Sequence, residues 1–283
     1  MGDVRYFAPT DLGEAVKLLA QYGKQATILA GGTDLVPKIN YYELKPEMLL
    51  YVGNLGLSYI KQVDGTLVIG AGTPLAQILA SEVVARSAPA LVHAAKQHSS
   101  VAVRSAATLG GNIANGSPAA DMAISLIAMD AKLRLVSVRG ERIVAIQDFF
   151  VGPGETVLKA DELLTEIQIP AVKGRAVFQK LGKRKAQACS IVIVGVRLEM
   201  DGKVCKAARI ALGSMAPTPL RCVKAEEMLV GKAVDAALVA QCAAAAVGAS
   251  SPIDDVRATA WYRRKAGTAL VAQALTQAAG LES

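Results

Sequence analysis

Two glycine-rich segments carry the residues best suited to hold a ligand. The first, residues 30–34 (AGGTD), ends the apolar run ATILA, and the second, residues 108–112 (TLGGN), is followed nine residues later by Asp121. Glycine has no Cβ, so successive backbone N–H groups can approach an anion closely, and the threonine hydroxyls and the asparagine amide add neutral donors. Either segment alone is more typical of an ordinary tight turn, but the two together predict a cradle for a pyrophosphate.

The usual nucleotide and hydrolase motifs do not account for these segments. Residues 70–75 (GAGTPL) begin like a dinucleotide fingerprint, but Leu75 stands where the third glycine belongs and the segment follows a predicted hairpin. The sequence contains no phosphate-binding P-loop, GxSxG or HExxH. The only histidines, His93 and His98, are each interpreted as structural residues on or just after a helix. With so few acid–base groups, the sequence favours a bound redox cofactor that does the chemistry.

Composition and charge exclude several classes of protein. Apolar residues make up 52% of the chain, which excludes a disordered chain. Lys and Arg exceed Asp and Glu by 31 − 24 = 7, but the basic residues are spread along the sequence. An anionic cofactor or acidic partner explains this excess as well as nucleic acid does, and we predict no nucleic-acid partner. The opening residues lack the apolar stretch of a signal peptide, and residues 236–249 fall short of the roughly 20 residues of a bilayer span.

The four cysteines indicate thiols and no metal centre. Cys189, Cys205, Cys222 and Cys242 are 16, 17 and 20 residues apart, and no CxxC pair exists. This spacing argues against a zinc or iron–sulfur site built by this chain alone. Four scattered cysteines fit reduced, mostly buried thiols, so we predict a cytoplasmic protein.

The first 170 residues read as two units. Thr10 is a candidate N-cap for a helix that ends at Gly23, and short strands are predicted at 26–30, buried on both faces, and 49–52, which makes a small α/β unit. From residue 59 the pattern predicts a hairpin turning at Asp64-Gly65, helices at 75–80 and 90–96, a strand pair at 132–138 and 142–146, and a strand at 163–169. This second unit is predicted as α+β with an antiparallel sheet.

A third unit is predicted after Lys173-Gly174. Strands are expected at 176–181, 190–200 and 203–214, followed by helices near 223–230, 235–249 and 256–279. Strands first and helices last indicate a small α+β domain. We therefore predict domains at 1–57, 58–173 and 174–283.

At the glycine segments the sequence resembles a known family. Five segments, in their order along the chain, resemble the flavin-binding subunit of the xanthine dehydrogenase and carbon monoxide dehydrogenase family of molybdenum hydroxylases. They are AGGTDL, TLGGNIANGSPAAD, QKLGKRKAQACSIVIVGV, GSMAPTPLR and DVRATAWYRRKAGTALVAQAL. The resemblance covers nearly the whole chain. It implies an α+β chain with a two-subdomain, vanillyl-alcohol-oxidase-like (PCMH-type) FAD-binding domain, followed by a small α+β C-terminal domain with a three-stranded antiparallel sheet and helices.

The resemblance also implies which residues bind FAD. Residues 28–35 match the first FAD loop of the family, and residues 108–112 match the second. Asp121 matches an acidic residue that accepts hydrogen bonds from FAD. Leu164 matches a residue that contacts the cofactor through its backbone, and Lys180 matches a lysine near the flavin. His98 stands where some relatives place an aromatic residue. The implied FAD-binding residues are Ile28, Leu29, Ala30, Gly31, Gly32, Thr33, Asp34, Leu35, His98, Thr108, Gly110, Gly111, Asn112, Asp121, Leu164 and Lys180. The first segment has no histidine to tether the flavin, so noncovalent FAD is expected.

The implied activity is electron transfer within a multi-subunit enzyme. A large subunit would hydroxylate the substrate at molybdopterin, with a purine or other N-heterocycle favoured, and a small subunit would pass electrons through [2Fe-2S] clusters to FAD here and on to NAD or another acceptor. The basic run KLGKRK at 180–185 is interpreted either as a loop near the flavin or as a solvated surface, and YRRKAG at 262–267 as a helix surface or subunit contact. A stand-alone FAD oxidase or reductase of the same fold, and a scaffold that has lost FAD, are the alternatives.

Overall fold

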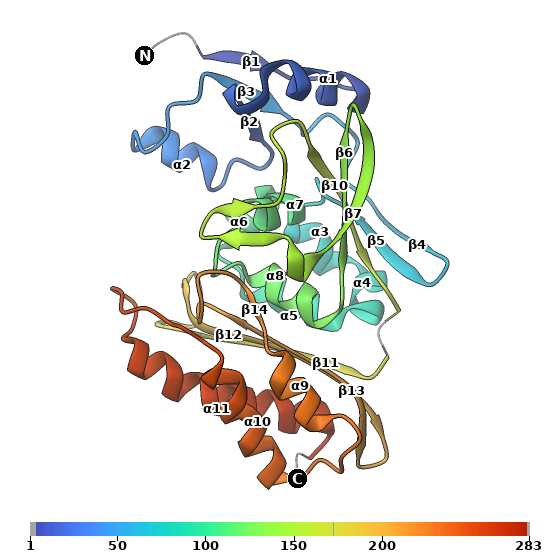
Figure 1. Cartoon of the computed structure of the whole chain (residues 1–283). Helices are drawn as coiled ribbons and strands as arrows, with labels where there is room; N and C mark the ends of the chain where they lie inside the picture. The colour runs from blue at the N-terminus through green and yellow to red at the C-terminus, as the bar shows by residue number, and fades with distance from the viewer. Residues whose placement is uncertain (1–3, 172, 282–283) are drawn as a thin grey trace.

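The chain forms three stacked layers in the computed structural model, which describes residues 4–171 and 173–281 (Figure 1). An N-terminal lobe lies at one end, a middle lobe of helices and an antiparallel sheet follows, and a C-terminal sheet covered by helices lies at the other end. Each layer has its own cluster of buried apolar side chains. No helix in the described part of the chain is long and apolar enough to cross a membrane.

The N-terminal lobe is a small parallel sheet with helical crossovers, as predicted. Its strands lie in the order β1 (Arg5–Phe7), β3 (Met48–Tyr51) and β2 (Ala26–Leu29), and the helices are α1 (Leu12–Tyr22), the short 3-10 helix η1 (Gly23–Gln25) and α2 (Leu35–Asn40). The predicted N-cap Thr10 is wrong by one residue, because Asp11 accepts the N–H of Glu14 at 3.0 Å. Strand β2 is only half-buried, contrary to prediction, because Ala26 and Ile28 border a cavity.

The middle lobe combines a five-stranded antiparallel sheet with six short helices. The strand order is β4 (Ile60–Val63), β5 (Thr66–Gly70), β10 (Leu163–Ile169), β6 (Lys132–Ser137) and β7 (Gly140–Ala145). The predicted hairpin turns at Asp64 and Gly65, whose φ values of 49° and 78° fit that dipeptide. The helices are α3 (Leu75–Ala80), α4 (Glu82–Ser87), α5 (Pro89–Gln97), α6 (Val101–Ala106), α7 (Leu109–Ala114) and α8 (Asp121–Ala128), and η2 (Ile146–Asp148), β8 (Phe150–Gly152) and β9 (Glu155–Thr156) complete the lobe.

The C-terminal layer contains the predicted three strands and one more. Strands β11 (Arg175–Gly182), β12 (Ser190–Asp201) and β13 (Val204–Gly213) are joined at the edge by β14 (Leu220–Arg221), and the helices are α9 (Val223–Leu229), α10 (Ala236–Gly248) and α11 (Ala260–Ala279). Helix α11 begins four residues later than predicted, because Asp255 accepts the N–H groups of Arg257 (2.8 Å) and Ala258 (3.1 Å) and holds them in a turn.

Helix α8 joins the middle lobe to this sheet. All eight of its residues are buried, and it packs against β12 and β13. Two glycines of the sheet make room for it: a Cβ on Gly195 would lie 2.7 Å from the Ile124 carbonyl oxygen, and one on Gly213 would lie 2.7 Å from the Ile124 side chain. The first residue of α8 is Asp121, so this packing fixes the predicted acidic residue where the lobes meet. The predicted boundaries at 57/58 and 173/174 stay predictions.

Candidate cofactor-binding site

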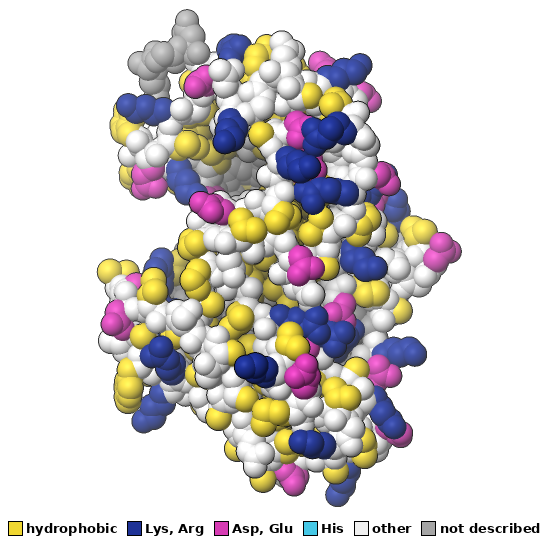
Figure 2. All heavy atoms as spheres, viewed as in Figure 1, with side chains coloured by type: hydrophobic (Ala, Val, Ile, Leu, Met, Phe, Trp, Pro, Cys, Tyr) yellow, Lys and Arg dark blue, Asp and Glu magenta, His cyan; other side chains and the backbone are white. Residues whose placement is uncertain are grey.

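A cavity of about 970 Å³ lies between the N-terminal and middle lobes and reaches the edge of the C-terminal sheet. Figure 2 shows the molecule hollowed below the N-terminal lobe, with Lys and Arg side chains at the rim. Fifteen of the sixteen predicted site residues line this cavity, from all three layers. The exception is Leu29, whose side chain lies on the other side of its strand, against the positions of Gly32 and Val36.

The first glycine segment offers unused backbone donors. Among the described residues, no acceptor lies within hydrogen-bond reach of the N–H groups of residues 31–34. Gly31 is required by close packing, because a Cβ there would lie 2.0 Å from the carbonyl oxygen of Ala106. Gly32 has a φ of 69°, which favours glycine. The segment therefore lies against the end of α6 with its donors free for a ligand.

The second glycine segment is a helix start, and its glycine amides are already bonded. Thr108 caps α7 by accepting the Gly111 N–H at 3.0 Å, and the Gly110 N–H donates to the Ala71 carbonyl at 2.8 Å. A Cβ on Gly110 would lie 2.6 Å from Ala71 Cβ, so the glycine allows the backbone of α7 to pack closely against Ala71. The prediction that these amides converge on an anion is wrong. What this segment offers a ligand is the buried Asn112 Oδ1, which has no partner among the described residues.

Asp121, His98 and Lys180 form one hydrogen-bonded group in the cavity wall. Asp121 Oδ2 lies 2.8 Å from His98 Nδ1 and 2.8 Å from Lys180 Nζ. The Lys180 ammonium also lies 3.4 Å from the Gln97 carbonyl. The other oxygen, Asp121 Oδ1, is buried with no partner in the described structure. His98 therefore lines the cavity, whereas the sequence predicts a structural histidine just after a helix. His93 is exposed on α5, outside the cavity.

Leu164 lies in β10 where the strand's pairing with β6 becomes irregular. The register shifts between Leu164 and Glu166, so the strand bends at the cavity border. Nearby, Glu162 also lines the cavity and accepts two hydrogen bonds of 2.8 Å from Arg142. These bonds lower the pKa of Glu162 and keep it ionised.

Sequence reasoning missed several lysines of the cavity. Lys38 pairs with Asp34 at 2.7 Å. Lys24 and Lys159 have no carboxylate within 4.0 Å in the described part of the chain. Their positions in the sequence give no signal, because Lys24, Lys38 and Lys159 lie in three separate elements: η1, α2 and the loop before β10. Two free ammonium groups in the cavity favour a negatively charged ligand.

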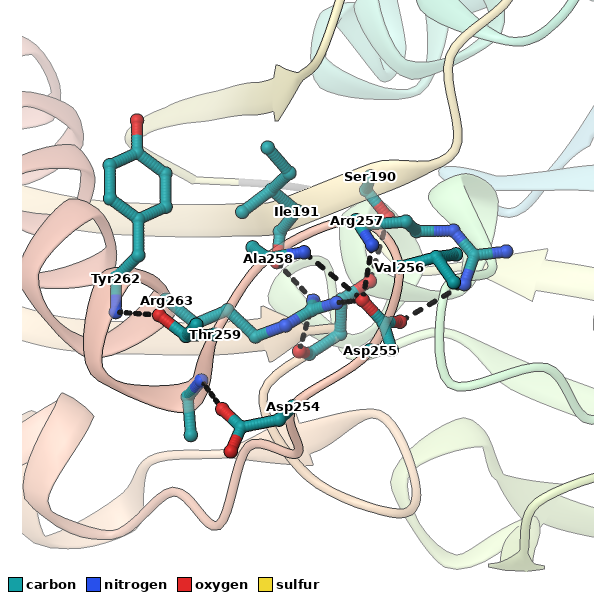
Figure 3. Close-up of polar contacts among 12 residues, drawn as sticks. Ser190, Ile191, Asp254, Asp255, Val256, Arg257, Ala258, Thr259, Tyr262 and Arg263 are labelled. Atoms are coloured by element: carbon teal, nitrogen blue, oxygen red, sulfur yellow. Dashed lines mark hydrogen bonds and ion pairs between the residues drawn. The ribbon is translucent and has the colours of Figure 1, made fainter.

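The C-terminal wall of the cavity is formed by residues 187–190 and is held from behind by a buried arginine (Figure 3). Arg263 is 2% exposed, and its guanidinium donates to the Ile191 carbonyl at 2.6 Å, the Ser214 carbonyl at 3.1 Å and Asp255 at 2.8 Å. Arg263 is therefore internal, although its segment was interpreted as a helix surface or subunit contact. Burial opposes ionisation of Asp255, but two backbone N–H groups and two arginines outweigh it and hold its pKa well below the usual range.

These residues fit a flavin dinucleotide. The free N–H groups of residues 31–34 and the unpaired lysines suit a pyrophosphate. The unpartnered oxygens of Asp121 and Asn112 suit ribityl or ring donors, because a buried acceptor without a partner costs about 1–3 kcal/mol. The volume is at the upper end of ligand-pocket sizes, as a molecule this large requires.

Comparisons with known proteins agree over nearly the whole chain. The family described as FAD binding domain in molybdopterin dehydrogenase matches residues 2–172, and the one described as CO dehydrogenase flavoprotein C-terminal domain matches residues 177–278. The chain is 35% identical to the carbon monoxide dehydrogenase medium chain of Hydrogenophaga pseudoflava, over 96% of each chain.

Two further matches come from an enzyme with a different name and from a solved structure. The chain is 38% identical to the nicotinate dehydrogenase FAD-subunit of Eubacterium barkeri, over 82% of this chain and 81% of that one. A solved carbon monoxide dehydrogenase from Hydrogenophaga pseudoflava superimposes with a TM-score of 0.94 at 34% identity, covering 97% of this chain and 96% of the other.

Proposed function

The chain belongs to the family of FAD-binding subunits of molybdenum hydroxylases, and from that premise we propose that it binds FAD noncovalently in the 970 Å³ cavity and relays electrons through it. The bound flavin supplies the redox chemistry. The chain's own residues bind and orient it, and no catalytic acid or base on this chain is needed for that role.

In this proposal several of the predicted residues hold FAD directly. The N–H groups of residues 31–34 bind the pyrophosphate, with help from Lys24 or Lys159. Asp121 Oδ1 and Asn112 Oδ1 accept hydrogen bonds from the cofactor, because both oxygens are buried without a protein partner among the described residues. Ile28 supplies apolar wall, Leu164 a backbone contact, and Lys180 holds Asp121 in place through an ion pair of 2.8 Å.

We propose that the chain works beside a molybdopterin-binding large subunit and a small subunit with [2Fe-2S] clusters. Support comes from the relatives, which are named as the medium chain or FAD-subunit of their enzymes and match 96% and 82% of this chain. A purine or other N-heterocycle is the proposed substrate class, in line with the nicotinate enzyme. The stand-alone oxidase is less favoured, because this chain and a carbon monoxide dehydrogenase medium chain match over 96% of each.

The proposed electron acceptor is NAD or another anionic molecule. A second pocket of about 370 Å³ adjoins the cavity and shares Lys180 and Ala188 with it. Its wall includes Lys183, Arg184 and Lys185, and no carboxylate is among its lining residues. A pocket with four cations next to the flavin site favours a phosphate-bearing acceptor. We also propose a cytoplasmic location, since all four cysteines are free thiols.

The observation that carries the proposal is that one cavity is lined both by Asp121, whose buried Oδ1 has no partner among the described residues, and by the free N–H donors of residues 31–34. The test is to add FAD to the purified chain and follow flavin fluorescence, absorbance and release by acid. Saturable uptake with full release by acid is expected for the wild type, and at least tenfold weaker uptake for Asp121→Asn. Glu82→Gln, at an exposed position outside the cavity, is the matched control and keeps wild-type affinity. A folded chain that takes up no FAD, alone or with its partner subunits, would refute the proposal.

A further inference from the structure

His98 is the only histidine that lines the cavity, and its ring is tied to a charged pair. Its Nδ1 lies 2.8 Å from Asp121 Oδ2, the same oxygen that Lys180 Nζ approaches at 2.8 Å. A carboxylate accepts, so the neutral ring carries its proton on Nδ1 and leaves Nε2 as the atom that can take another. The side chains of His98, Asp121 and Lys180 are 20%, 4% and 7% exposed, so His98 is the member of the group that water reaches.

The charge of this group depends on His98. Asp121 and Lys180 carry opposite charges and cancel, and histidine is the side chain whose charge changes near neutral pH. The helices packed around the ring bring Lys96 from α5 and Arg104 from α6, and Arg104 Nη1 donates to the His98 carbonyl at 2.9 Å. The other titratable groups that line the cavity are Lys24, Asp34, Lys38, Lys159, Glu162 and Cys189.

Resting on the FAD site proposed above, we propose that His98 takes up a proton when the bound cofactor is reduced. Two electrons enter from the partner iron–sulfur clusters, or from dithionite in the test below. Protons enter from solvent, those that the cofactor takes up itself and one more on His98 Nε2, and nothing leaves. The extra negative charge in a partly enclosed cavity attracts a proton to a group of the cavity wall that can accept one, and Asp121 on Nδ1 stabilises the resulting imidazolium.

The pH dependence of the reduction potential tests this directly. Each proton taken up with two electrons changes the redox equilibrium tenfold per pH unit, which is about 30 mV for a two-electron couple. With the full chain loaded with FAD, His98 is expected to add up to about 30 mV per pH unit to the wild-type slope, beyond what the cofactor's own protons contribute. His98→Phe keeps an aromatic ring but has no proton to gain, so its slope is expected to be smaller than the wild-type slope by up to about 30 mV per pH unit.

Controls separate His98 from its surroundings. His93→Phe makes the same change at the exposed histidine of α5 and is expected to keep the wild-type slope. Cys189→Ser removes the cavity thiol and is also expected to keep it. His98→Gln serves if the phenylalanine variant does not fold. A second readout counts protons with an indicator dye in weakly buffered solution: up to about one more proton per two electrons is expected in the wild type than in either His98 variant.

The outcomes distinguish this inference from the proposed function. Equal slopes and equal proton counts in the wild type and the His98 variants, with FAD bound in all of them, would overturn the role of His98 and leave the FAD site standing. A folded chain that binds no FAD would overturn both.

Discussion

Replacing Gly31 by alanine should disturb both the fold and the FAD site. A Cβ at this position would lie 2.0 Å from the Ala106 carbonyl oxygen and 2.7 Å from its carbon. Both atoms are backbone, so neither can rotate away, and the first glycine segment must move off α6. Overpacking of this kind costs about 1–3 kcal/mol, which for a chain of this size lowers Tm by about 2 to 12 °C.

The same movement displaces the free N–H groups of residues 31–34, so we expect FAD affinity to fall at least tenfold. At an FAD concentration 100 times the wild-type Kd, bound ligand stabilises the wild type by about 2.7 kcal/mol and a tenfold weaker variant by only about 1.4 kcal/mol. Thermal unfolding with and without FAD therefore measures both effects in one experiment.

Gly248→Ala is the matched control for this experiment. It makes the same substitution at the exposed last residue of α10, where nothing lies within 4 Å of the new Cβ. It should leave FAD affinity unchanged and raise stability by up to about 1 kcal/mol, because alanine favours a helix over glycine. A Gly31→Ala variant with wild-type Tm and wild-type FAD affinity would refute the close packing of the first glycine segment on α6.

Three further predictions concern the C-terminal layer. Arg263→Met removes the guanidinium that donates to the Ile191 and Ser214 carbonyls and to Asp255. The free energy of unfolding measured with urea should therefore fall by about 3 kcal/mol, and a fall of less than about 1 kcal/mol would contradict the internal role of this arginine. Because the folded-state pKa of Asp255 is depressed, its stabilising effect is present above the unfolded value near 3.9 and lost as pH falls below it. The stability difference between wild type and Asp255→Asn should therefore be largest near about pH 6 and shrink below about pH 4, and a difference independent of pH would contradict this. Of the four thiols only Cys189 is exposed. A thiol reagent such as DTNB should therefore label one site rapidly in the folded chain and the other three only after denaturation. A second site that reacts rapidly in the folded chain would contradict the burial of the other thiols.

The sequence predicted elements well where one local signal decides them. The Asp64-Gly65 hairpin, strand β10 and helix α10 with Asp235 as its N-cap all lie where turn chemistry, apolar runs and capping residues place them. Local sequence patterns do not predict features that depend on contacts between residues far apart in the sequence. The Gly110 N–H is not free for a ligand, because Ala71, far away in the sequence, accepts it, and β14 is a strand through its pairing with β13, where Arg221 lies opposite Ala211.

The same contrast holds for the candidate site. The glycine segments and Asp121 could be located in the sequence, because their residue types and order are distinctive. The lysines of the cavity could not, since Lys24 and Lys159 come together only through the packing of separate lobes. Leu29 does not line the cavity, because successive side chains of a strand point to opposite sides, and its contact with FAD stays a prediction.

The position of Lys180 has a consequence for how the protein is made. The ribosome synthesises the chain from its N-terminus, so the lobes that supply residues 28–35 and Asp121 emerge from the ribosome first. Lys180 lies on the edge strand β11, which is held by β12 and covered by α11, the last helix of the chain. The cavity therefore keeps an open wall until α11 has left the ribosome and folded. Cofactor loading becomes a late step of biogenesis, and a nascent chain stalled before α11 would be a poor acceptor for FAD.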